Sequence, residues 1–475
     1  MTDLGLYDSD RNESAQRGAL LDGEIPVAVY GLGKMGLPLA GVYADLTGNV
    51  VGADVDPDVV ASINDGQCHV DGEPGLATLV ARTVDEGSLR AVDDPTEAAA
   101  EARLHVVIVP TLIDEGRADL SVVESVVEDI AAGLRPGDLV VVESTVPPRT
   151  CEDVVGPRLA AGSGLDPGEF GVAFCPERTE SGRALQDIRG SWPKIVGGVD
   201  SESTRAAALV YDQVTDNDVI RASDATTAEA VKVFEGAYRD VNIALANELA
   251  TYTDALGIDV REAIAVANTV DESDILRPGP GVGGHCIPYY PYFLFGEFDV
   301  DSPLLRTARE VNDEMPAFVV GKLASLLADR GKSLGGASIL VLGGTYRAGV
   351  AETRASPAIG LTETLSANGA SVDIVDPMLD SFDEFDATPV SLADAAADYD
   401  GIVLVTAHAA FEEINWARFA EPVVVDTRAV LDPETVGHEL YTIGGRGDVD
   451  IAARIRGGPP ASGPADTAAT DGGED

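Results

Sequence analysis

The segment of this chain that is best suited to chemistry is a glycine-rich loop that ends in a cysteine, GPGVGGHCIP, at residues 279–288. Its four glycines within six residues leave bare backbone against which a ligand could lie. The Cys286 thiol, with His285 beside it, is a candidate nucleophile. The alternative is an irregular turn around a small buried cysteine. The other cysteines, Cys68, Cys151 and Cys175, lack this setting, and we expect them to be structural.

A second candidate is Lys232, because only five of the 32 basic residues in the chain are lysines. Helical spacing places Gly236 and Arg239 on the same face as Lys232, which makes that face basic and locally bare. An anionic ligand or reaction intermediate suits such a face. The alternative is a surface lysine that pairs with Glu229 or Glu235.

A dinucleotide-binding pattern, GLGKMG, follows a β-branched segment at residues 25–30 and precedes a helical one at 37–46. Its first glycine permits a tight turn, its second lets a pyrophosphate approach the helix N-terminus, and its third lets the helix pack on the strand. Asp54, 23 residues after Gly31, would bind a ribose hydroxyl and repel a 2′-phosphate, which favours NAD over NADP. A glycine-rich turn without a ligand is the alternative. The cofactor-binding residues predicted here are Gly31, Gly33, Lys34, Met35, Gly36 and Asp54.

The elements that must position these residues fall into three regions. Apolar strands alternate with helical segments at both ends of the chain, a pattern typical of doubly wound parallel sheets. The predicted strands are 25–30, 50–54, 104–110 and 139–143 at the first end, and 338–342, 371–375, 402–406 and 423–426 at the second. The two ends look like distant copies, because each places a glycine (Gly31, Gly343) after its first strand and an acid (Asp54, Asp376) after its next.

The region between them is helical. Residues 226–256 predict one helix that begins at a capping box formed by Thr226 and Glu229. At ~1.5 Å per residue this helix would be about 45 Å long, which suits a connector or a dimer interface. Further helices are predicted at 259–267 and 304–329. We therefore predict an α/β chain with two Rossmann-like doubly wound domains joined by a helical middle domain that contains a long central helix.

The expected domain boundaries follow from these changes in pattern. They are a disordered acidic N-terminus at 1–24, an NAD-binding Rossmann domain at 25–210, a helical central and dimerisation domain with the cysteine loop at 211–330, a substrate-binding Rossmann-like domain at 331–456 and a disordered tail at 457–475. The tail is rich in Gly, Pro, Ala and Asp.

The charge of the chain excludes several classes of function. It has 81 acidic against 32 basic residues, for a formal net charge of −49. General nucleic-acid binding and docking on an anionic membrane are excluded, because both require a basic surface. Excess carboxylate with scarce lysine and an ordinary 45% hydrophobic content indicates adaptation to high salt, where screening weakens carboxylate repulsion.

Cysteine and histidine spacing predicts no metal site, since there is no C-x-x-C or H-x-x-x-H. Residues 1–23 contain no basic and apolar leader pattern, and no run of 18 apolar residues occurs. We expect a cytoplasmic protein that is not bound to a membrane.

Taken together, these segments resemble the UDP-glucose/GDP-mannose dehydrogenase family over residues 25–456. The resemblance is specific because it rests on many segments: GLGKMGLPLA, ESTVPPRT (143–150), CPERTESGRAL (175–185), KIVGG (194–198), YRDVNIALANELA (238–250), GPGVGGHCIP (279–288), REVNDEMP (309–316), ETRASP (352–357) and VVVDTRAVLD (423–432). GPGVGGHCIP and YRDVNIALANE look most like the UDP-N-acetyl-D-mannosamine dehydrogenase branch.

The resemblance implies a four-electron oxidation of a sugar C6 hydroxyl to a carboxylate, with two NAD consumed. It implies that the Cys286 thiolate forms a thiohemiacetal and then a thioester, that Lys232 stabilises oxyanions, and that Glu177 and Thr145 activate and order the hydrolytic water. Thr111 would lie near the nicotinamide and Arg354 would touch the cofactor. The predicted substrate-binding residues are Glu177, Arg178, Lys232, Arg239, Gly283, Arg347 and Arg428. The long central helix is the dimer interface of the family.

Three positions depart from the family pattern. Gly236 stands where Asn is usual, four residues after the helix lysine, and Tyr290 stands where Asp is usual, four residues after the cysteine. Arg347 replaces a lysine. A tyrosine hydroxyl can donate a hydrogen bond but is a poor base at neutral pH.

Several functions fit these residues. The first is a UDP-sugar 6-dehydrogenase that acts on UDP-N-acetyl-D-mannosamine, with UDP-glucose as the runner-up substrate. The second is a two-electron 3-hydroxyacid dehydrogenase, which would not need the cysteine loop or the C-terminal domain. The third, motivated by Gly236 and Tyr290, is a catalytically impaired protein that binds NAD and a UDP-sugar.

Overall fold

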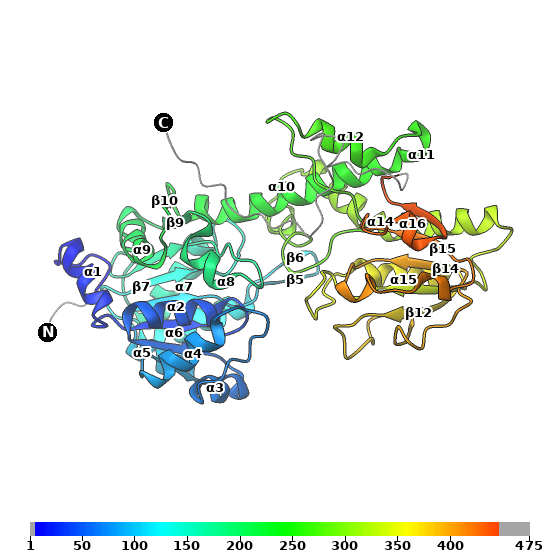
Figure 1. Cartoon of the computed structure of the whole chain (residues 1–475). Helices are drawn as coiled ribbons and strands as arrows, with labels where there is room; N and C mark the ends of the chain where they lie inside the picture. Colours follow the sequence, from blue (N-terminus) through cyan, green and yellow to red (C-terminus); the bar gives the residue numbers. More distant parts are fainter. Residues whose placement is uncertain (1–4, 446–475) are drawn as a thin grey trace, which may run out of the picture. The chain divides into compact units, whose positions relative to one another are not determined.

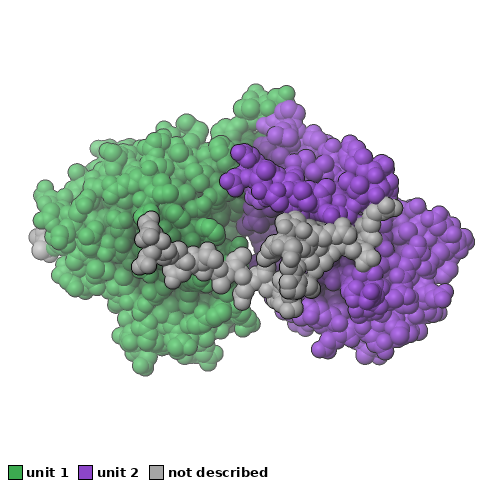
Figure 2. All heavy atoms as spheres, turned by 45° about the horizontal axis from the view of Figure 1, so that its top comes forward, with its two compact units in different colours: residues 1–236, 289–301 green, residues 237–288, 302–475 purple. Residues whose placement is uncertain are grey.

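The computed structural model describes residues 5–445, which form two compact units (Figure 2). Unit 1 comprises residues 1–236 and 289–301, and unit 2 comprises residues 237–288 and 302–475. The disorder expected for residues 457–475 lies outside the described residues. No described helix combines the length and the apolar character that crossing a membrane requires.

Unit 1 is built on an eight-stranded sheet with the order β10-β9-β8-β7-β4-β1-β2-β3 (Figure 1). Every neighbouring pair is parallel except β8 and β9. A separate antiparallel hairpin, β5–β6, follows β4. The strands are β1 (Val27–Tyr30), β2 (Val50–Ala53), β3 (Leu89–Val92), β4 (Leu104–Val107), β5 (Leu112–Asp114), β6 (Arg117–Asp119), β7 (Leu139–Val142), β8 (Gly171–Phe174), β9 (Lys194–Gly198) and β10 (Val219–Arg221).

Helices cover both faces of this sheet, because successive strand residues point to opposite sides. Val27 and Val29 of β1 join the apolar core beneath α2, α4 and α9, whereas Ala28 and Tyr30 join the core beneath α5, α6 and α7. The helices are α2 (Gly36–Thr47), α3 (Pro57–Asn64), α4 (Leu76–Asp85), α5 (Pro95–Glu101), α6 (Ser121–Gly133), α7 (Gly156–Ser163), α8 (Ala184–Gln186), α9 (Ser201–Val214) and α13 (Tyr292–Phe295), with π-helical turns η1 (Cys151–Val155) and η2 (Asp187–Ser191).

The N-terminal segment differs from the expectation of disorder over residues 1–24. Residues Glu13–Leu21 form helix α1, with Asn12 as its N-cap. Leu20 is fully buried in the unit 1 core, and the Gln16 side chain accepts a hydrogen bond from Arg205 of α9 at 3.0 Å. The prediction was wrong for this part because the acidic composition of the segment concealed a short apolar helix face.

The long central helix is present, with two differences from the prediction. It runs as α10 from Ala225 to Thr251, and a separate turn, α11 (Thr253–Leu256), follows it. Its N-terminal cap is Asp224, whose carboxylate accepts from the Thr227 N–H at 2.7 Å, so the predicted capping box is wrong. The Glu229 carboxylate instead binds backbone N–H groups of Arg149 and Cys151, as described below. The flanking helices are α12 (Val260–Ala267) and α14 (Pro303–Asp329).

Unit 2 contains a six-stranded, fully parallel sheet with the order β13-β12-β11-β14-β15-β16. Helices α14 and α15 pack on one face, and an apolar cluster around Trp416 and Phe419 covers the other. The elements are β11 (Ser338–Leu342), α15 (Pro357–Ala367), β12 (Ser371–Val375), β13 (Thr388–Pro389), β14 (Gly401–Leu404), η3 (Ala409–Phe411), η4 (Trp416–Arg418), β15 (Val423–Asp426), α16 (Pro433–Val436) and β16 (Glu439–Thr442). Two doubly wound sheets and a helical middle confirm the predicted fold class.

Candidate active site

The turn between β1 and α2 has the geometry that a dinucleotide needs. Gly31 has φ +90°, and a Cβ there would lie 2.5 Å from the Ile108 carbonyl oxygen. A Cβ at Gly36 would lie 1.8 Å from the Gly31 carbonyl oxygen, so the helix can approach the strand only with glycine at this position. Gly33 is exposed and has no atom near its missing Cβ, which leaves open space beside the helix N-terminus. These three glycines therefore fit a bound pyrophosphate.

Asp54 stands at the end of β2, beside this turn. Its Oδ2 accepts from the Leu32 N–H at 2.8 Å and its Oδ1 accepts from the Asp56 N–H at 3.0 Å. These bonds fix the carboxylate while each oxygen keeps a further lone pair for a ribose hydroxyl. Lys34 is exposed in the turn, and the Met35 sulfur accepts from the Thr179 hydroxyl at 2.9 Å.

Lys232 and Glu177, predicted from separate segments, lie together in unit 1. The Lys232 Nζ is 3.6 Å from the Glu177 Oε2 and also donates to the Glu177 backbone oxygen. Their side chains are 11% and 17% exposed, so the ion pair is partly desolvated while still open to a small ligand. Glu229 and Glu235 have other partners, so the alternative pairing for Lys232 is wrong.

Thr145, just after β7, is held close to two other residues of interest. The Thr111 hydroxyl donates to the Thr145 carbonyl oxygen at 2.6 Å. The Thr145 hydroxyl lies 3.3 Å from the Tyr290 hydroxyl. Glu177 follows β8, and its backbone N–H lies 3.4 Å from the carbonyl oxygen of Glu143 at the end of β7. Neighbouring strand ends thus bring the water-activating candidates to one edge of the sheet.

Glu229 is a structural contributor to this region that sequence reasoning missed. It is fully buried, and its carboxylate accepts from the backbone N–H groups of Arg149 at 2.6 Å and Cys151 at 2.8 Å. It therefore ties the loop after Thr145 to the helix that carries Lys232. Burial raises its pKa to about 7, against the opposing hydrogen bonds from Cys151 and Arg149. In the sequence, only its position three residues before Lys232 indicated that Glu229 lies near the site.

Arg178, predicted to bind the substrate, has partners within the chain. Its guanidinium donates to the Glu235 carboxylate of α10 and to the Pro193 carbonyl oxygen at 3.1 Å. Both interactions anchor the segment after Glu177 to its surroundings. Arg178 thus holds the segment after Glu177 in place in the described structure.

The cysteine loop belongs to unit 2, where neighbouring chain segments explain its glycines. A Cβ at Gly283 would lie 2.8 Å from both the Ala355 carbonyl oxygen and the Tyr346 Cβ. The Gly284 N–H donates to the Arg354 carbonyl oxygen at 2.8 Å. Gly283 therefore allows close packing of the loop on neighbouring segments of the chain. At the other end of the loop, the Gly279 N–H donates to Asn247 of α10 at 2.8 Å.

At the end of this loop the Cys286 thiol is exposed and free. The neighbouring His285 Nε2 lies 2.5 Å from the Glu352 Oε2. By contrast, Cys151 and Cys175 are buried, and burial raises the pKa of both thiols well above its usual range. Among the described residues, Cys286 is therefore the cysteine whose thiol is exposed.

The predicted arginines differ in how firmly they are held. Arg428 follows β15; its Nε donates to the Val405 carbonyl oxygen at 2.7 Å, and burial lowers its pKa to about 10, so it stays cationic at neutral pH. Arg347 and Arg239 are exposed, on the loop after β11 and on α10. Arg354 is partly exposed on the loop that contacts Gly284.

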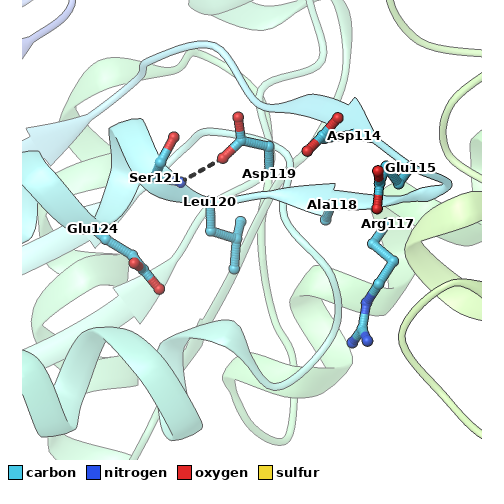
Figure 3. Close-up of a pocket in the computed structure, with 8 residues that line it drawn as sticks. All are labelled: Asp114, Glu115, Arg117, Ala118, Asp119, Leu120, Ser121 and Glu124. Atoms are coloured by element: carbon cyan, nitrogen blue, oxygen red, sulfur yellow. Dashed lines mark hydrogen bonds between the residues drawn. The ribbon is translucent and has the colours of Figure 1, made fainter.

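A pocket beside the β5–β6 hairpin contains none of the predicted site residues (Figure 3). Its lining is Asp114, Glu115, Arg117, Ala118, Asp119, Leu120, Ser121 and Glu124. Four carboxylates against one guanidinium make it unsuitable for a nucleotide diphosphate. Among residues 5–445, no cluster of three or more His, Cys, Asp or Glu is arranged to hold a metal ion.

Comparison with known proteins identifies the family. Residues 25–215 match the NAD binding domain of the UDP-glucose/GDP-mannose dehydrogenase family, residues 226–314 match its central domain, and residues 340–433 match its UDP binding domain. The chain belongs to this family. It is thus an NAD-dependent nucleotide-sugar dehydrogenase, and the two-electron 3-hydroxyacid alternative is wrong.

Individual members of the family share most of their length with the chain. A UDP-N-acetyl-D-mannosamine dehydrogenase from Pyrococcus horikoshii is 35% identical over 89% of this chain and 100% of its own. Its solved structure has a TM-score of 0.83 over 90% of this chain and 100% of that chain. An NDP-N-acetyl-D-galactosaminuronic acid dehydrogenase from Ralstonia nicotianae is 36% identical over 85% of this chain and 96% of its own. The structure of a UDP-glucose dehydrogenase from Pyrobaculum islandicum is 28% identical, with a TM-score of 0.76 over 88% of this chain and 96% of that chain.

The raised pKa of Glu229 leads to a prediction about stability. Its folded pKa of about 7 exceeds its unfolded value near 4.5, so the folded state holds the extra proton and this group makes stability fall as pH rises from about 4.5 through about 7. We expect Glu229→Gln to remove this dependence. The stability of the parent relative to the variant should drop by on the order of 3 kcal/mol between pH 5 and pH 8.

Unfolding of both proteins in urea at the two pH values measures this difference. The matched control is Glu363→Gln, at an exposed position of α15, which should leave the parent's pH dependence unchanged. An equal difference between parent and Glu229→Gln at pH 5 and pH 8 contradicts the prediction.

Proposed function

We propose that this family member oxidises the C6 hydroxyl of UDP-N-acetyl-D-mannosamine to the carboxylate of UDP-N-acetyl-D-mannosaminuronate. The exposed Cys286 thiol carries the proposal, because a covalent link to the enzyme retains the aldehyde between the two oxidations. The name and the full-length match of the Pyrococcus horikoshii relative support the sugar. UDP-glucose is the runner-up, supported by the less similar Pyrobaculum islandicum structure.

Each oxidation removes a hydride from the sugar carbon C6 and a proton from the oxygen bound to that carbon, and NAD, when bound, supplies the hydride acceptor. The first oxidation converts the alcohol to an aldehyde. The Cys286 sulfur then adds to the aldehyde carbon to give a thiohemiacetal, whose oxidation gives a thioester. Water cleaves the carbon–sulfur bond, which releases the carboxylate and regenerates the thiol.

The charged groups of unit 1 suit the remaining tasks. The Lys232 ammonium stabilises the negative oxygen that develops at each carbonyl addition. Glu177, 3.6 Å from that ammonium, takes a proton from the hydrolytic water, and the Thr145 hydroxyl orders that water. Arg178 acts through its contacts with Glu235 and Pro193, which hold the Glu177 segment.

Cofactor and substrate contacts complete the proposal. The NAD site is formed by Gly31, Gly33, Lys34, Met35, Gly36, Asp54, Thr111, Thr145 and Arg354. Arg347 and Arg428 bind the UDP portion, because planar guanidinium groups suit phosphates and carbonyl oxygens. Arg239 and Gly283 complete the substrate contacts. We assign residues 25–210 to the NAD domain, 211–330 to the central domain and 331–456 to the UDP-sugar domain.

The test of this function is stoichiometry with a substrate panel. Purified protein in high salt with NAD should release two NADH per sugar acid, fastest with UDP-N-acetylmannosamine among that sugar, UDP-N-acetylglucosamine, UDP-glucose and GDP-mannose. One NADH per sugar contradicts the four-electron reaction. Binding of NAD and a UDP-sugar without any NADH, restored by Gly236→Asn with Tyr290→Asp, favours the impaired alternative.

We further propose a homodimer through α10. Tyr238 and Leu245 of α10 and Tyr252, which directly follows the end of α10, are exposed at seven-residue intervals in unit 2, and Leu256 of α11 is exposed as well. An apolar stripe of this period on a long helix suits a second copy of the same helix. Light scattering should give twice the chain mass, and Leu245→Glu should shift it to one chain mass. A monomeric parent contradicts the proposal.

The excess of acidic residues leads to a prediction about how salt concentration affects activity and stability. With a formal net charge of −49, the carboxylates repel strongly when screening is weak. We expect both activity and melting temperature to rise between dilute buffer and molar KCl. Sucrose at matched osmolality is the control, because it does not screen charge. Full activity and an unchanged melting temperature in dilute buffer contradict the high-salt adaptation.

We place the protein in the cytoplasm, on the support of its four unpaired cysteines, which suit a reducing compartment. Its uronate product would be consumed by glycosyl transfer into surface polysaccharides. A cell fractionation assay that finds the activity outside the cytoplasmic fraction contradicts this placement.

A further inference from the structure

Gly236 and Tyr290, which are 54 residues apart in sequence, interlock within unit 1. A Cβ at Gly236 would lie 1.9 Å from the Tyr290 Cδ2, 2.7 Å from its Cγ and 2.9 Å from its Cβ. Real Cβ atoms do not approach other atoms so closely. The ring of Tyr290 therefore occupies the space of a side chain at position 236, and only glycine on α10 admits it.

The ring is fixed in this place by apolar neighbours. Tyr290 is 6% exposed and packs with Val233 of α10 and Phe293 of α13 in a small buried cluster. The ring centroids of Tyr290 and Phe293 are 6.0 Å apart, within the range of favourable aromatic pairs. A buried ring with these contacts has few alternative rotamers.

The same side chain touches two groups of the proposed catalytic site. The Lys232 Nζ lies 5.9 Å from the centroid of the Tyr290 ring, within reach of a cation–π interaction. The Tyr290 hydroxyl lies 3.3 Å from the Thr145 hydroxyl. Thr145 is itself tied to Thr111 through its carbonyl oxygen. Tyr290 thus connects the helix that carries Lys232 with the strand end that carries Thr145.

We propose that Tyr290, seated on Gly236, is a positioning residue for Lys232 and Thr145. Its ring contacts the Lys232 ammonium through a cation–π interaction, and its hydroxyl orients the Thr145 hydroxyl. A phenol is neutral at physiological pH, so Tyr290 adds no negative charge near Lys232. The carboxylate that pairs with Lys232 is that of Glu177. This inference rests on the proposed function, which assigns the oxyanion to Lys232 and the hydrolytic water to Thr145.

The role of the Tyr290 hydroxyl is tested with Tyr290→Phe, which removes the hydroxyl and keeps the ring. We expect kcat to fall by about three- to tenfold, the usual effect of one lost hydrogen bond, with KM for NAD and the UDP-sugar within about twofold of the parent. Because thioester hydrolysis should become slower, a rapid release of NADH should precede the steady state. The matched control is Tyr399→Phe, which removes a 2.6 Å hydrogen bond to Asp373 in unit 2 and should leave kcat unchanged.

The steric fit is tested with a double-mutant cycle. We expect Gly236→Ala to lower the melting temperature by several degrees and kcat by about tenfold or more, because the new methyl group must displace the ring. In the Tyr290→Ala background the two nearest of these three atoms are gone and only the Cβ at 2.9 Å remains of them, so the cost of Gly236→Ala should be much smaller. Gly321→Ala on α14, where the added methyl group meets nothing within 4 Å, is the control; it should leave kcat unchanged and the melting temperature equal or slightly higher, because Ala favours a helix over Gly.

The outcomes separate this inference from the proposed function. A parent that forms no sugar acid overturns the proposed function, while the melting-temperature cycle still tests the interlock of Gly236 with Tyr290. An active parent whose kcat is unchanged in Tyr290→Phe overturns the positioning role. Additive effects of Gly236→Ala and Tyr290→Ala overturn the steric fit.

Discussion

Cys286→Ala is expected to reduce formation of the sugar acid by at least about a thousandfold, because the variant has no nucleophile to hold the aldehyde or to form the thioester. The thiol is exposed at the end of a loop that is anchored at Gly279 and Gly284, so its removal disturbs no packed core. NAD binding should persist, because the dinucleotide turn around Gly33 is remote in sequence and makes no use of the cysteine.

Acid formation is measured by chromatography of the nucleotide sugars, and NAD binding by calorimetry. Cys68→Ala is the matched control, since Cys68 is another free cysteine outside the proposed site. Unchanged acid formation in Cys286→Ala rules out covalent catalysis by this residue.

Lys232→Met is expected to lower kcat by about a hundred- to a thousandfold, the range found when one oxyanion-stabilising donor is removed. The substitution removes the ammonium and also leaves the Glu177 carboxylate without the cation that lies 3.6 Å away. Since Lys232 is partly buried beside Glu177 and its proposed role is in the chemical step, the loss should fall on kcat more than on KM for NAD.

Initial rates at saturating NAD and UDP-sugar measure this effect in molar salt. Lys332→Met is the control, because Lys332 pairs with Asp400 in unit 2 and neither residue is a proposed site residue. A kcat within about threefold of the parent would show that Lys232 does not carry the oxyanion.

Much of the fold was predictable because its signals are local. β-branched strands followed by glycine or acid mark the carboxyl ends of parallel strands, and these signals located β1, β2, β11 and β12. Weaker strands such as β13, with two residues, carry no such signal. Helix α1 was missed because its apolar residues are few and are buried only through contact with elements distant in sequence, such as α2 and α9.

The partners of charged residues were less predictable. Thr226 and Glu229 have the spacing of a capping box, yet Asp224 caps α10 and Glu229 binds the backbone of Arg149 and Cys151. Arg178, expected at the substrate, pairs with Glu235, a partner that its own segment does not suggest. In each case a backbone or side-chain group distant in sequence competes successfully with the local partner, because burial makes an unpaired polar group costly.

The amino-acid sequence by itself determined which chemical groups are available: a thiol in a glycine-rich loop, a rare lysine, a dinucleotide turn and an excess of carboxylates. The tertiary structure decided which of these groups meet. It joins Lys232 with Glu177 across 55 residues and Thr145 with Tyr290 across 145, and it seats Tyr290 on Gly236. These contacts depend on the packing of helices and strand ends that are far apart in the chain, and no local pattern encodes that packing.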